Sequence, residues 1–371
     1  MSSSPNIPSK VRFALVGCGV IAKTQVRALL EMKEQVDLVC LCDIDESQAQ
    51  ALSEEFDIPT MDLDTLCRDT TIEAVTVCTP SGLHADLAVR LMEAGKHVIV
   101  EKPMDITVEA CQRMLDAAND SGRKLAVISQ HRFDPSSRAV IAAREKGDLG
   151  ELVFVEARVP WFRSQEYYDS AGWRGTMAMD GGGCMMNQGI HTIDLMLWMA
   201  GPVRRVSAQT RICAHERIEV EDLALITVEF ENGMLGSVMA STSLYPGYPC
   251  SLGLYGQKGS ALIEGDGLKT LAVEGKETLE GEGANAHARQ VAAGGTRSAT
   301  AAVDAGESYQ WSWGDAHQAQ FQDFVEAIRE DRSPAVDGHC GLAAVEFILA
   351  CYESAKADGQ WVHLTGSACL A

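Results

Sequence analysis

The sequence predicts an α/β protein in two parts: a doubly wound parallel sheet comes first, and an α+β part with a large, mainly antiparallel open sheet follows. Strand-like and helical runs alternate from residue 11 to about 133, a rhythm typical of parallel strands joined by crossover helices. After about 134 the strand-like runs follow one another, with short turns such as Glu231-Asn232-Gly233 between them, which favours antiparallel pairing. Because 371 residues exceed what a single core usually supports, we expect two domains, 1–133 and 134–371.

Apolar runs and helical periodicity give the elements of the first part. In a doubly wound sheet, ligands bind beyond the carboxyl ends of the strands, so the residues that follow each strand are the candidates for a site. The expected strands are 11–16, 37–42, 74–78, 97–100 and 124–128, and the expected helices are 20–34, 46–56, 82–95 and 107–120.

The second part begins with a helix at 135–146 and a strand at 152–159, and a Gly-rich loop then leads to a helix at 184–199. Residues 275–310 are rich in Ala, Gly and Glu without strong periodicity, so we expect a long exposed loop or a partly disordered insertion there. The remaining expected strands are 203–212, 222–230, 234–242, 250–256, 260–264, 269–273 and 361–364, and the remaining helices are 315–330 and 340–357.

A glycine-rich turn follows the first strand. The run Gly17-Cys18-Gly19-Val20-Ile21-Ala22 has the pattern G-x-G-x-x-A. Gly17 permits a tight bend, Gly19 leaves room for a pyrophosphate to approach the backbone, and Ala22 lets helix and strand pack closely. The turn therefore predicts a phosphate-binding site at a helix N-terminus.

An acidic residue follows the second strand. Asp43 lies 21 positions after Ala22, where a carboxylate can accept both ribose hydroxyls of an adenosine. Its charge would repel a 2′-phosphate, and neither Ile44 nor Asp45 supplies an arginine to bind one, so we predict NAD rather than NADP. The alternative is a solvated acidic turn.

Three further strand ends carry polar residues: Thr79-Pro80, Glu101-Lys102-Pro103 and Gln130-His131-Arg132. Lys102 places an ammonium group at the ligand-binding edge of the sheet, and the proline after it often has a cis bond that directs such a side chain inward. In the second part, Asn187 and His191 lie four residues apart on a helix that is otherwise apolar. They are either hydrogen-bonded core residues or ligand-binding groups.

Together these motifs, with His84 and the block from Asp180-Gly181-Gly182-Gly183 to Asp194, resemble the glucose–fructose oxidoreductase / inositol 2-dehydrogenase (Gfo/Idh/MocA) family over nearly the whole chain. The resemblance implies a Rossmann domain, a C-terminal domain whose open sheet mediates oligomerisation, and a nicotinamide dehydrogenase acting on sugars or cyclitols. In the family pattern, the lysine of the Glu-Lys-Pro motif matches Lys102, and the helical Asp-x-x-x-His matches Asn187 to His191.

Asn187 departs from that pattern, because many members have a carboxylate there. The runs from Arg163 to Asp169, from Trp173 to Thr176 and from Met186 to Gln188 are similar to the UDP-N-acetylglucosaminuronic acid 3-dehydrogenase branch, which also has the asparagine. The expected cofactor-binding residues are Gly17, Gly19, Val20, Ile21, Ala22, Asp43, Thr79, Pro80, His84, Glu101, Lys102, Gln130, Trp173 and Arg174. The expected substrate-binding residues are Lys102, Arg163, Tyr167, Tyr168, Asn187, Gln188 and His191.

Lys102, His191 and Asn187 are the expected catalytic residues. His191 has an ordinary pKa of about 6.5 and can take the hydroxyl proton at physiological pH. Lys102 stabilises the developing alkoxide, and Asn187 orients a sugar hydroxyl. Trp173 and Arg174 reach the nicotinamide or phosphates, unless they only anchor a loop. Arg163 suits a carboxylate or diphosphate, unless it is simply solvated.

The composition limits the partners. A net charge of −21 would repel nucleic acid and anionic membranes, so we expect neither as a partner. The start of the chain, Met1-Ser2-Ser3-Ser4-Pro5, lacks the signal-peptide pattern, and no run reaches the ~18 apolar residues of a membrane span, so we expect a cytoplasmic protein. The scattered cysteines suit buried reduced thiols, and no metal site is expected. Apolar strands such as Ala224–Phe230 and Met234–Ala240 on an open sheet indicate a homodimer or homotetramer.

Three functions agree with these observations. The favoured one is an NAD-dependent dehydrogenase acting on a secondary alcohol of a sugar, sugar nucleotide or cyclitol. The second is an enzyme of the same fold that uses tightly held NAD for a transient oxidation during glycoside cleavage, with no net redox change. The third is a catalytically silent NAD-binding regulator, which the presence of Lys102 and His191 disfavours.

Overall fold

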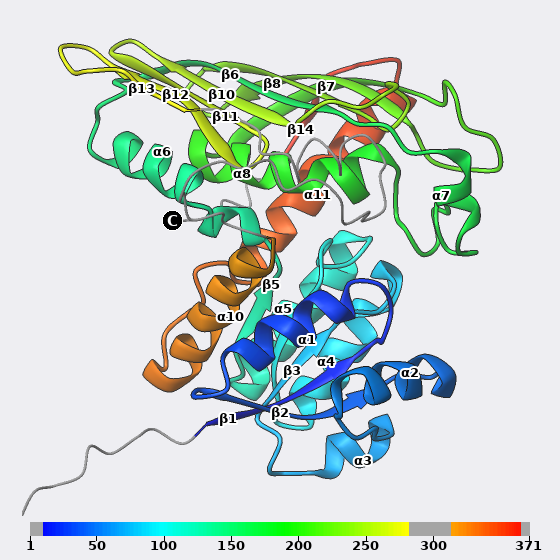
Figure 1. Cartoon of the computed structure of the whole chain (residues 1–371). Helices are drawn as coiled ribbons and strands as arrows, with labels where there is room; N and C mark the ends of the chain where they lie inside the picture. Colours follow the sequence, from blue (N-terminus) through cyan, green and yellow to red (C-terminus); the bar gives the residue numbers. More distant parts are fainter. Residues whose placement is uncertain (1–9, 282–312, 365–371) are drawn as a thin grey trace, which may run out of the picture. The chain divides into compact units, whose positions relative to one another are not determined.

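The computed structural model describes residues 10–281 and 313–364 (Figure 1). The chain divides into two compact units. The first unit contains Met1–Met104, Glu109–Gln130 and Ser312–Gly338, and the second contains Asp105–Val108, His131–Trp311 and His339–Ala371. Ser312–Gly338 thus lies with the first unit, although the sequence places it in the 134–371 part.

The first unit has a five-stranded sheet in the order β2-β1-β3-β4-β5, with all neighbouring strands parallel. This confirms the predicted doubly wound α/β fold. The strands are β1 Val11–Val16, β2 Val36–Cys42, β3 Ala74–Val77, β4 His97–Val100 and β5 Leu125–Val127. The helices are α1 Ala22–Glu31, α2 Glu46–Phe56, α3 Leu63–Arg68, α4 His84–Glu93, α5 Val108–Ser121 and α10 Trp313–Glu330.

One face of β1 explains why α10 joins the first unit. Phe13 is fully buried and meets Phe321 and Phe324 of α10 edge to face, with each ring pair 6.2 Å apart. Ala28 and Leu29 of α1 complete this cluster. Burying three aromatic side chains removes several hundred Å² of apolar surface from water, and this gain draws a segment from the end of the chain onto the first sheet.

The second unit has a nine-stranded sheet in the order β13-β12-β11-β10-β6-β9-β8-β7-β14. Only the β6–β9 pairing is parallel, so the prediction of a mainly antiparallel sheet is confirmed. Buried and exposed side chains alternate along its strands: in β8, Ala224, Ile226 and Val228 are buried while Leu225 and Thr227 are exposed. The strands are β6 Leu152–Pro160, β7 Val203–Arg211, β8 Leu223–Phe230, β9 Leu235–Ser241, β10 Ser251–Gly256, β11 Gly259–Glu264, β12 Gly267–Val273, β13 Leu279–Glu280 and β14 Val362–His363.

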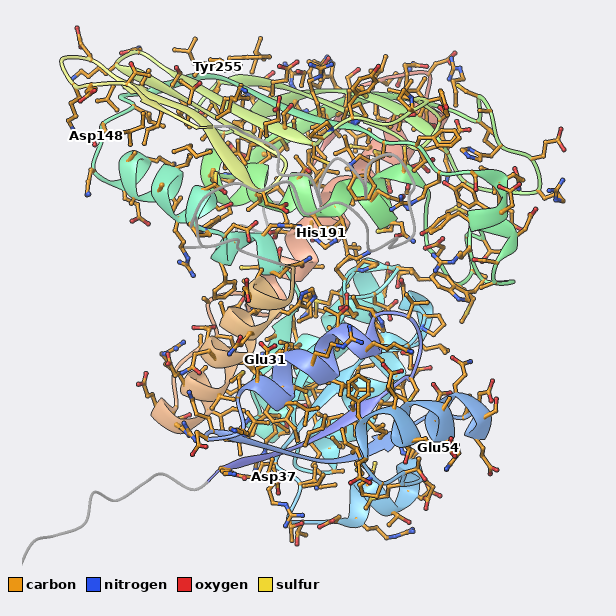
Figure 2. The ribbon with its side chains drawn as sticks, viewed as in Figure 1. Glu31, Asp37, Glu54, Asp148, His191 and Tyr255 are labelled. Carbon is orange, nitrogen blue, oxygen red and sulfur yellow. The ribbon has the colours of Figure 1, made fainter. Side chains whose placement is uncertain are left out.

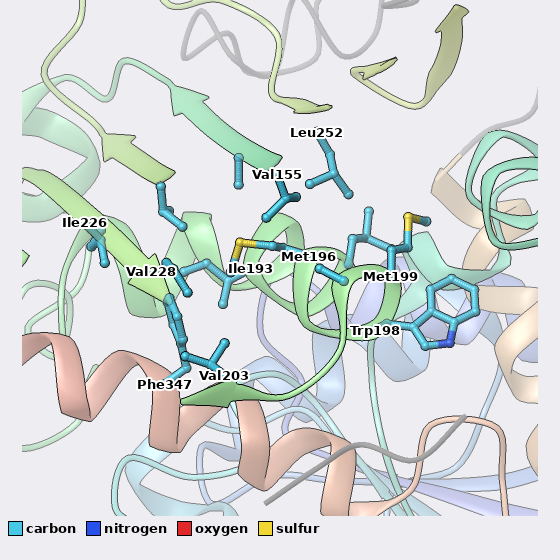
Figure 3. Close-up of a cluster of buried hydrophobic side chains, with 14 of the residues drawn as sticks. Val155, Ile193, Met196, Trp198, Met199, Val203, Ile226, Val228, Leu252 and Phe347 are labelled. Atoms are coloured by element: carbon cyan, nitrogen blue, oxygen red, sulfur yellow. The ribbon is translucent and has the colours of Figure 1, made fainter. Parts of the chain in front are cut away.

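Helices cover one face of this sheet (Figure 1). They are α6 Pro135–Glu145, α8 Ile190–Ala200 and α11 Gly338–Lys356. Ile193, Met196 and Met199 of α8 are buried against strand residues such as Val155 and Val228 (Figure 3). The core therefore fixes α8, the helix that carries His191.

The other face carries aromatic and aliphatic side chains. Phe154 of β6 lies opposite Tyr255 of β10, and the two rings stack 6.1 Å apart. Figure 2 marks Tyr255, which is 39% exposed, and Leu225 and Leu235 are also exposed. Cross-strand pairs of this kind stabilise the sheet, but they leave apolar surface uncovered within this chain.

Three details differ from the sequence prediction. The short helices α3 and α7 Gln165–Asp169 were not predicted, because they are too brief to show a clear periodicity. β13 lies within the segment expected to be irregular, where it pairs with Thr270 and Leu271, and residues 282–310 of that segment lie outside the described residues. The predicted helix 184–199 begins with a π-helical turn at Cys184–Gly189.

Six cysteines that suggested reduced thiols are free in the structure: Cys18, Cys40, Cys67, Cys78, Cys111 and Cys184. All of them except Cys67 are buried, and burial raises the pKa of Cys40 to about 12. Such thiols act as small apolar side chains. Within residues 10–281 and 313–364, no helix has both the length and the apolar character that a membrane span requires.

Candidate active site

The glycine-rich turn is shaped by two different constraints. Gly17 has φ +96°, and a Cβ there would lie 2.6 Å from the carbonyl carbon of Cys78, so only glycine fits. A Cβ on Gly19 would meet no atom within 4 Å. Packing within the described chain therefore gives no reason for glycine at position 19, whereas close approach of a pyrophosphate does.

The rest of the turn leads into α1. Ala22 is fully buried with Leu15 of β1 and Leu41 of β2, as close packing of helix and strand requires. Val20 is 84% exposed, so the predicted cofactor-binding residues of this turn include one accessible apolar side chain.

Asp43 follows β2 and contacts this turn. Its Oδ2 accepts the Cys18 N–H at 2.6 Å, and its Oδ1 accepts the Asp45 N–H at 2.8 Å. An ionised carboxylate has about four acceptor positions, so these bonds leave the group able to accept further donors. Ile44 next to it is fully exposed.

Buried side chains hold the loops that follow β3 and β4. The ring nitrogens of His84 lie 2.9 Å from the carbonyl oxygens of Thr79 and Pro103. Glu101 accepts a 2.6 Å hydrogen bond from Gln25 and a 3.1 Å bond from the Lys102 N–H. The Lys102–Pro103 bond is cis, as predicted. His84 and Glu101 thus fix the backbone on either side of Lys102.

Two predicted cofactor-binding residues of the first unit have buried polar atoms without a hydrogen-bond partner among the described residues. They are Thr79 Oγ1 and Gln130 Oε1. Such atoms are rare in folded proteins, and a bound ligand is one of the few explanations. Both residues follow strands, β3 and β5, at the ends where a doubly wound sheet binds its ligand.

In the second unit, three consecutive positions require glycine, each because of a different close contact. Gly181 has φ +75°, and a Cβ there would lie 2.4 Å from Ile106. A Cβ on Gly182 would lie 2.1 Å from the Tyr352 hydroxyl, and one on Gly183 would lie 1.8 Å from the Glu221 carbonyl oxygen. The glycines therefore let the chain pass closely over its neighbours before the helix of His191.

Glu221 is a buried carboxylate that sequence reasoning missed. It accepts the N–H groups of Gly183 and Met185 at 3.0 and 2.9 Å and the Tyr352 hydroxyl at 3.0 Å. Burial raises the pKa of Glu221 above its ordinary value, although these hydrogen bonds act in the opposite direction. The carboxylate caps the start of the π-helical turn, where backbone N–H groups lack partners within the helix.

The π-helical turn sets the surroundings of Asn187. Gly189 lies near the carbonyl of Cys184, which a Cβ would approach to 3.0 Å, and the α-helix begins only at Ile190. Turns of this type recur at functional sites. Asn187 Nδ2 donates to Asp180 Oδ1 at 2.8 Å, and Asp180 Oδ2 accepts the Gly175 N–H at 2.9 Å. Asp180 thus orients the amide of Asn187 with its nitrogen toward the carboxylate.

His191, marked in Figure 2, lies beside a second histidine. The rings of His191 and His131 meet edge to face at 5.3 Å. His131 Nδ1 lies 2.7 Å from Asp134 and 3.7 Å from Asp266. Burial alone lowers the pKa of His131, but these carboxylates and Asp194 raise it to about 9.

This cluster is the one group of metal-ligand type among the described residues. A metal would need the neutral imidazole, whereas the hydrogen bond to Asp134 and the nearby carboxylates raise the pKa of His131. In this structure the three residues form an ion-paired group next to His191. Arg132 and Asp194, which belong to the same motifs, form a buried bidentate pair at 2.7 and 2.6 Å. Their role is to anchor α8.

Three other predicted residues, Arg163, Arg174 and Gln188, contact Tyr167. The guanidinium groups of Arg174 and Arg163 lie 4.3 and 5.0 Å from its ring centroid. Its hydroxyl accepts hydrogen bonds from Arg174 at 2.6 Å and Gln188 at 3.3 Å. Arg174 Nε and Gln188 Oε1 are buried without hydrogen-bond partners among the described residues. This arrangement concentrates positive charge and unmet hydrogen-bonding capacity, which suits an anionic ligand.

The other predicted residues of this segment are placed differently. Tyr168 is only 5% exposed, and its hydroxyl lies 2.8 Å from Thr242 Oγ1. The guanidinium of Arg174 lies 4.7 Å from the Trp173 ring. Arg174, which was predicted to bind cofactor with Trp173, thus also contacts the residues predicted to bind substrate.

Comparison with known proteins gives full-length similarities. A family model described as "Oxidoreductase family, NAD-binding Rossmann fold" matches residues 11–129, and the GFO/IDH/MocA C-terminal domain matches 137–262. Inositol 2-dehydrogenase of Rhizobium meliloti is 25% identical over 94% of this chain and 98% of its own length.

Two solved structures are also similar. The WlbA dehydrogenase of Chromobacterium violaceum, in complex with NADH and UDP-GlcNAcA, is 32% identical, with a TM-score of 0.81 and coverage of 98% of this chain and 99% of its own. The same enzyme of Bordetella pertussis is 30% identical, with a TM-score of 0.80 and coverage of 96% and 99%.

Proposed function

Since the chain belongs to the GFO/IDH/MocA oxidoreductase family, we propose that it is an NAD-dependent dehydrogenase whose substrate is an anionic sugar or sugar nucleotide. The family, the NAD cofactor and the oxidation of a CH–OH group in sugar-type substrates agree with the sequence predictions. The anionic character of the substrate goes beyond those predictions, and it rests on the residues that contact Tyr167.

The first unit fits the cofactor. The open space at Gly19 suits the pyrophosphate, and Asp43 retains acceptor capacity for ribose hydroxyls. Thr79 and Gln130 offer the buried oxygens that lack partners among the described residues. When bound, NAD supplies the hydride acceptor for the oxidation of a secondary alcohol.

The proton chemistry falls to the chain's own residues. His191 takes the proton of the reacting hydroxyl through its imidazole. The ring of His131 contacts that of His191 edge to face, 5.3 Å away between ring centroids. Lys102 stabilises the negative charge that develops on the oxygen. Asn187, with its nitrogen held by Asp180, presents its carbonyl oxygen as an acceptor for a sugar hydroxyl.

The substrate's acidic group is assigned to the residues around Tyr167. Arg174 has no acidic partner among the described residues: its contacts are the Tyr167 hydroxyl and ring and the Trp173 ring. A carboxylate or phosphate supplies the missing counter-charge and can accept two N–H groups from one guanidinium. The two similar WlbA structures, which hold UDP-GlcNAcA, support the same substrate class.

The test is to mix the full chain with NAD and matched pairs of sugars that differ only in an acidic group, such as glucose with glucuronic acid and UDP-GlcNAc with UDP-GlcNAcA. NADH absorbance and product chromatography are recorded together. We expect NADH to form with the acidic member of a pair. Preference for the neutral member contradicts the anionic assignment. Glycoside cleavage without NADH establishes the non-redox alternative, and bound NAD without any turnover establishes the regulator.

We also propose that the chain forms a homodimer or homotetramer through the outer face of its large sheet. Phe154 and Tyr255 stack on this face, and Leu225 and Leu235 are about half exposed there, which is more apolar surface than a monomer usually leaves uncovered. A monomeric mass in light scattering at micromolar concentration contradicts this. We also propose a cytoplasmic location, which the free thiols of the six cysteines named above support.

A further inference from the structure

The segment 212–222, which connects β7 to β8, contacts several stretches that carry predicted substrate-binding residues, although no residue in it was predicted to be functional. It lies against three stretches that carry predicted residues: 161–169, 173–177 and 183–188. Its own side chains include two that are fully buried or nearly so, His215 (8% exposed) and Asp222 (0% exposed). Buried ionisable groups are costly unless they are paired, so this pair requires an explanation.

His215 makes two hydrogen bonds, one through each ring nitrogen. Nδ1 lies 2.9 Å from Asp222 Oδ2, and Nε2 lies 2.8 Å from the carbonyl oxygen of Arg163. Asp222 also accepts three backbone N–H groups, from Cys213, Ala214 and His215 itself. These bonds hold the pKa of Asp222 at about 2, against the effect of burial, so it is ionised at neutral pH.

A carbonyl oxygen and a carboxylate can only accept, so both ring nitrogens of His215 must carry a proton to make these bonds. Burial alone lowers the pKa of His215, but the bond to Asp222, the Arg163 carbonyl and the charge of Asp222 together raise it above its ordinary value. The imidazolium is therefore a fixed link between the start of β8 and the backbone of Arg163.

The same segment makes further contacts with the substrate residues. Gln165 and Glu216 exchange two hydrogen bonds, at 2.7 and 2.9 Å, and Arg217 pairs with Asp169 at 2.8 Å. The Glu219 N–H donates to the Gly175 carbonyl at 2.8 Å. Apart from Glu219 and Glu221, the other polar contacts lie at exposed positions, where each contributes little. His215 is the buried one, and its bond to the Arg163 carbonyl adds to the bond that the Arg163 N–H donates to the Thr242 carbonyl at 2.8 Å.

We propose that His215 is a positioning residue: as a doubly hydrogen-bonded imidazolium it holds the backbone at Arg163, and with it the arginine and tyrosine side chains that receive the acidic group of the substrate. The groups that face it are Asp222 directly before β8, Tyr168 from α7, whose ring lies 4.7 Å away, and Arg163. The inference rests on the proposed function, because the restraint matters only if this segment binds substrate.

Loss of the His215 proton at high pH should therefore weaken substrate binding. Neutral imidazole has one N–H, so one of the two bonds is lost as pH rises through the raised pKa. KM should increase over that range while kcat changes little, because His215 does not touch the reacting atoms.

The first test compares His215→Gln with His215→Asn. The glutamine amide nitrogen takes approximately the place of Nε2 and can still donate to the Arg163 carbonyl, whereas the asparagine nitrogen takes that of Nδ1 and cannot. Hydrogen–deuterium exchange of the full chain without ligands should be about tenfold faster or more across 161–177 in His215→Asn, and close to wild type in His215→Gln. His363→Asn, at an exposed position on β14, is the matched control.

The second test observes the ring itself. Nitrogen-15 shifts of the His215 imidazole should show both nitrogens still protonated at pH 6.5, and His215→Gln should abolish the rise of KM with pH while leaving kcat within about twofold. Equal exchange in the glutamine and asparagine variants, or a ring that is neutral at pH 6.5, overturns the proposal. Hydrogen exchange and nitrogen-15 shifts are measured without substrate. An absence of dehydrogenase activity would therefore contradict the proposed function without affecting these two measurements.

Discussion

The two units hold their predicted site residues in different ways. In the first unit, the predicted residues follow the carboxyl ends of parallel strands, as Asp43 follows β2 and Lys102 follows β4. In the second unit, the predicted residues from Arg163 to Gln188 lie on an irregular stretch, and His191 lies on α8. That stretch keeps its shape through contacts with distant residues such as His215, Glu221 and Tyr352.

This difference explains why the surroundings of the predicted residues could be inferred from the sequence in the first unit but not in the second. A strand followed by a turn is a local pattern, and the parallel pairing of the strands is enough to bring such turns to one edge of the sheet. The glycines at 181, 182 and 183 are equally visible in the sequence, but their partners are 38 to 170 positions away. Sequence spacing shows that they matter and does not show what they approach.

The strongest test of the second unit is His191→Ala. If His191 is the base, kcat should fall by about 10²–10⁴-fold, the usual contribution of general base catalysis, while NAD affinity is unchanged. Steady-state kinetics and NAD titration measure the two, and His363→Ala on β14 is the control. Near-normal turnover would assign His191 to the core beside His131 and leave Lys102 as the candidate for proton transfer.

The corresponding test of the first unit is Lys102→Met. Loss of the charge that stabilises the alkoxide should lower kcat by about 10²–10³-fold. If both residues act on one oxygen, the double variant should be little worse than the poorer single variant. Lys33→Met, at an exposed position after α1, is the control. Multiplicative losses in the double variant would mean that the two halves act independently.

A third change converts the cofactor preference. Asp43→Ser with Ile44→Arg removes the charge that repels a 2′-phosphate and adds a group that binds it at a fully exposed position. Because hydrogen bonds to charged groups contribute about 1.5–3 kcal/mol, the ratio of NAD to NADP affinity should fall by roughly ten- to a hundredfold. Since Asp43 also accepts the Cys18 N–H, the melting temperature must be checked, with Asp37→Ser on β2 as the control. An unchanged ratio in a stable variant would remove Asp43 from cofactor selection.

Asn187→Asp tests how the second unit orients its amide. The new carboxyl group would face Asp180 across the present 2.8 Å contact, so one of the two must bind a proton. We expect KM to rise by about tenfold near neutral pH and less at low pH. The reciprocal variant Asn187→Asp with Asp180→Asn restores the pairing and should recover most of the loss. No recovery would show that Asp180 does not orient position 187.

The smallest expected effect concerns the ion-paired cluster of His131. Its pKa of about 9 exceeds the ordinary value of 6.5, so its contribution to stability is complete below pH 6.5 and is lost as pH rises toward 9. His131→Gln should therefore lower the melting temperature at pH 6 by roughly 2–4 °C for each kcal/mol lost, and the difference from wild type should shrink by pH 9. A difference that is constant with pH would mean that packing, not charge, is what the substitution removes.

The sequence by itself determined the fold class, the first sheet and the position of nearly every strand, because alternating burial and strand–turn–helix patterns are properties of neighbouring residues. It also identified the cofactor through Gly17, Gly19 and Asp43, whose roles depend on one turn and one strand end. The similarity of Asn187 and His191 to a family motif pointed to the second half of the site.

The tertiary structure alone decided what surrounds those residues. The π-helical turn at 184–189, the orientation of Asn187 by Asp180, and the cation at His131 next to His191 arise from contacts between separate elements. His215 and Glu221 carry no sequence signal, because a lone histidine or glutamate between two strands is usually solvated. Their function comes from burial, which makes a charged group keep its partners, and burial is fixed only when the whole sheet has formed.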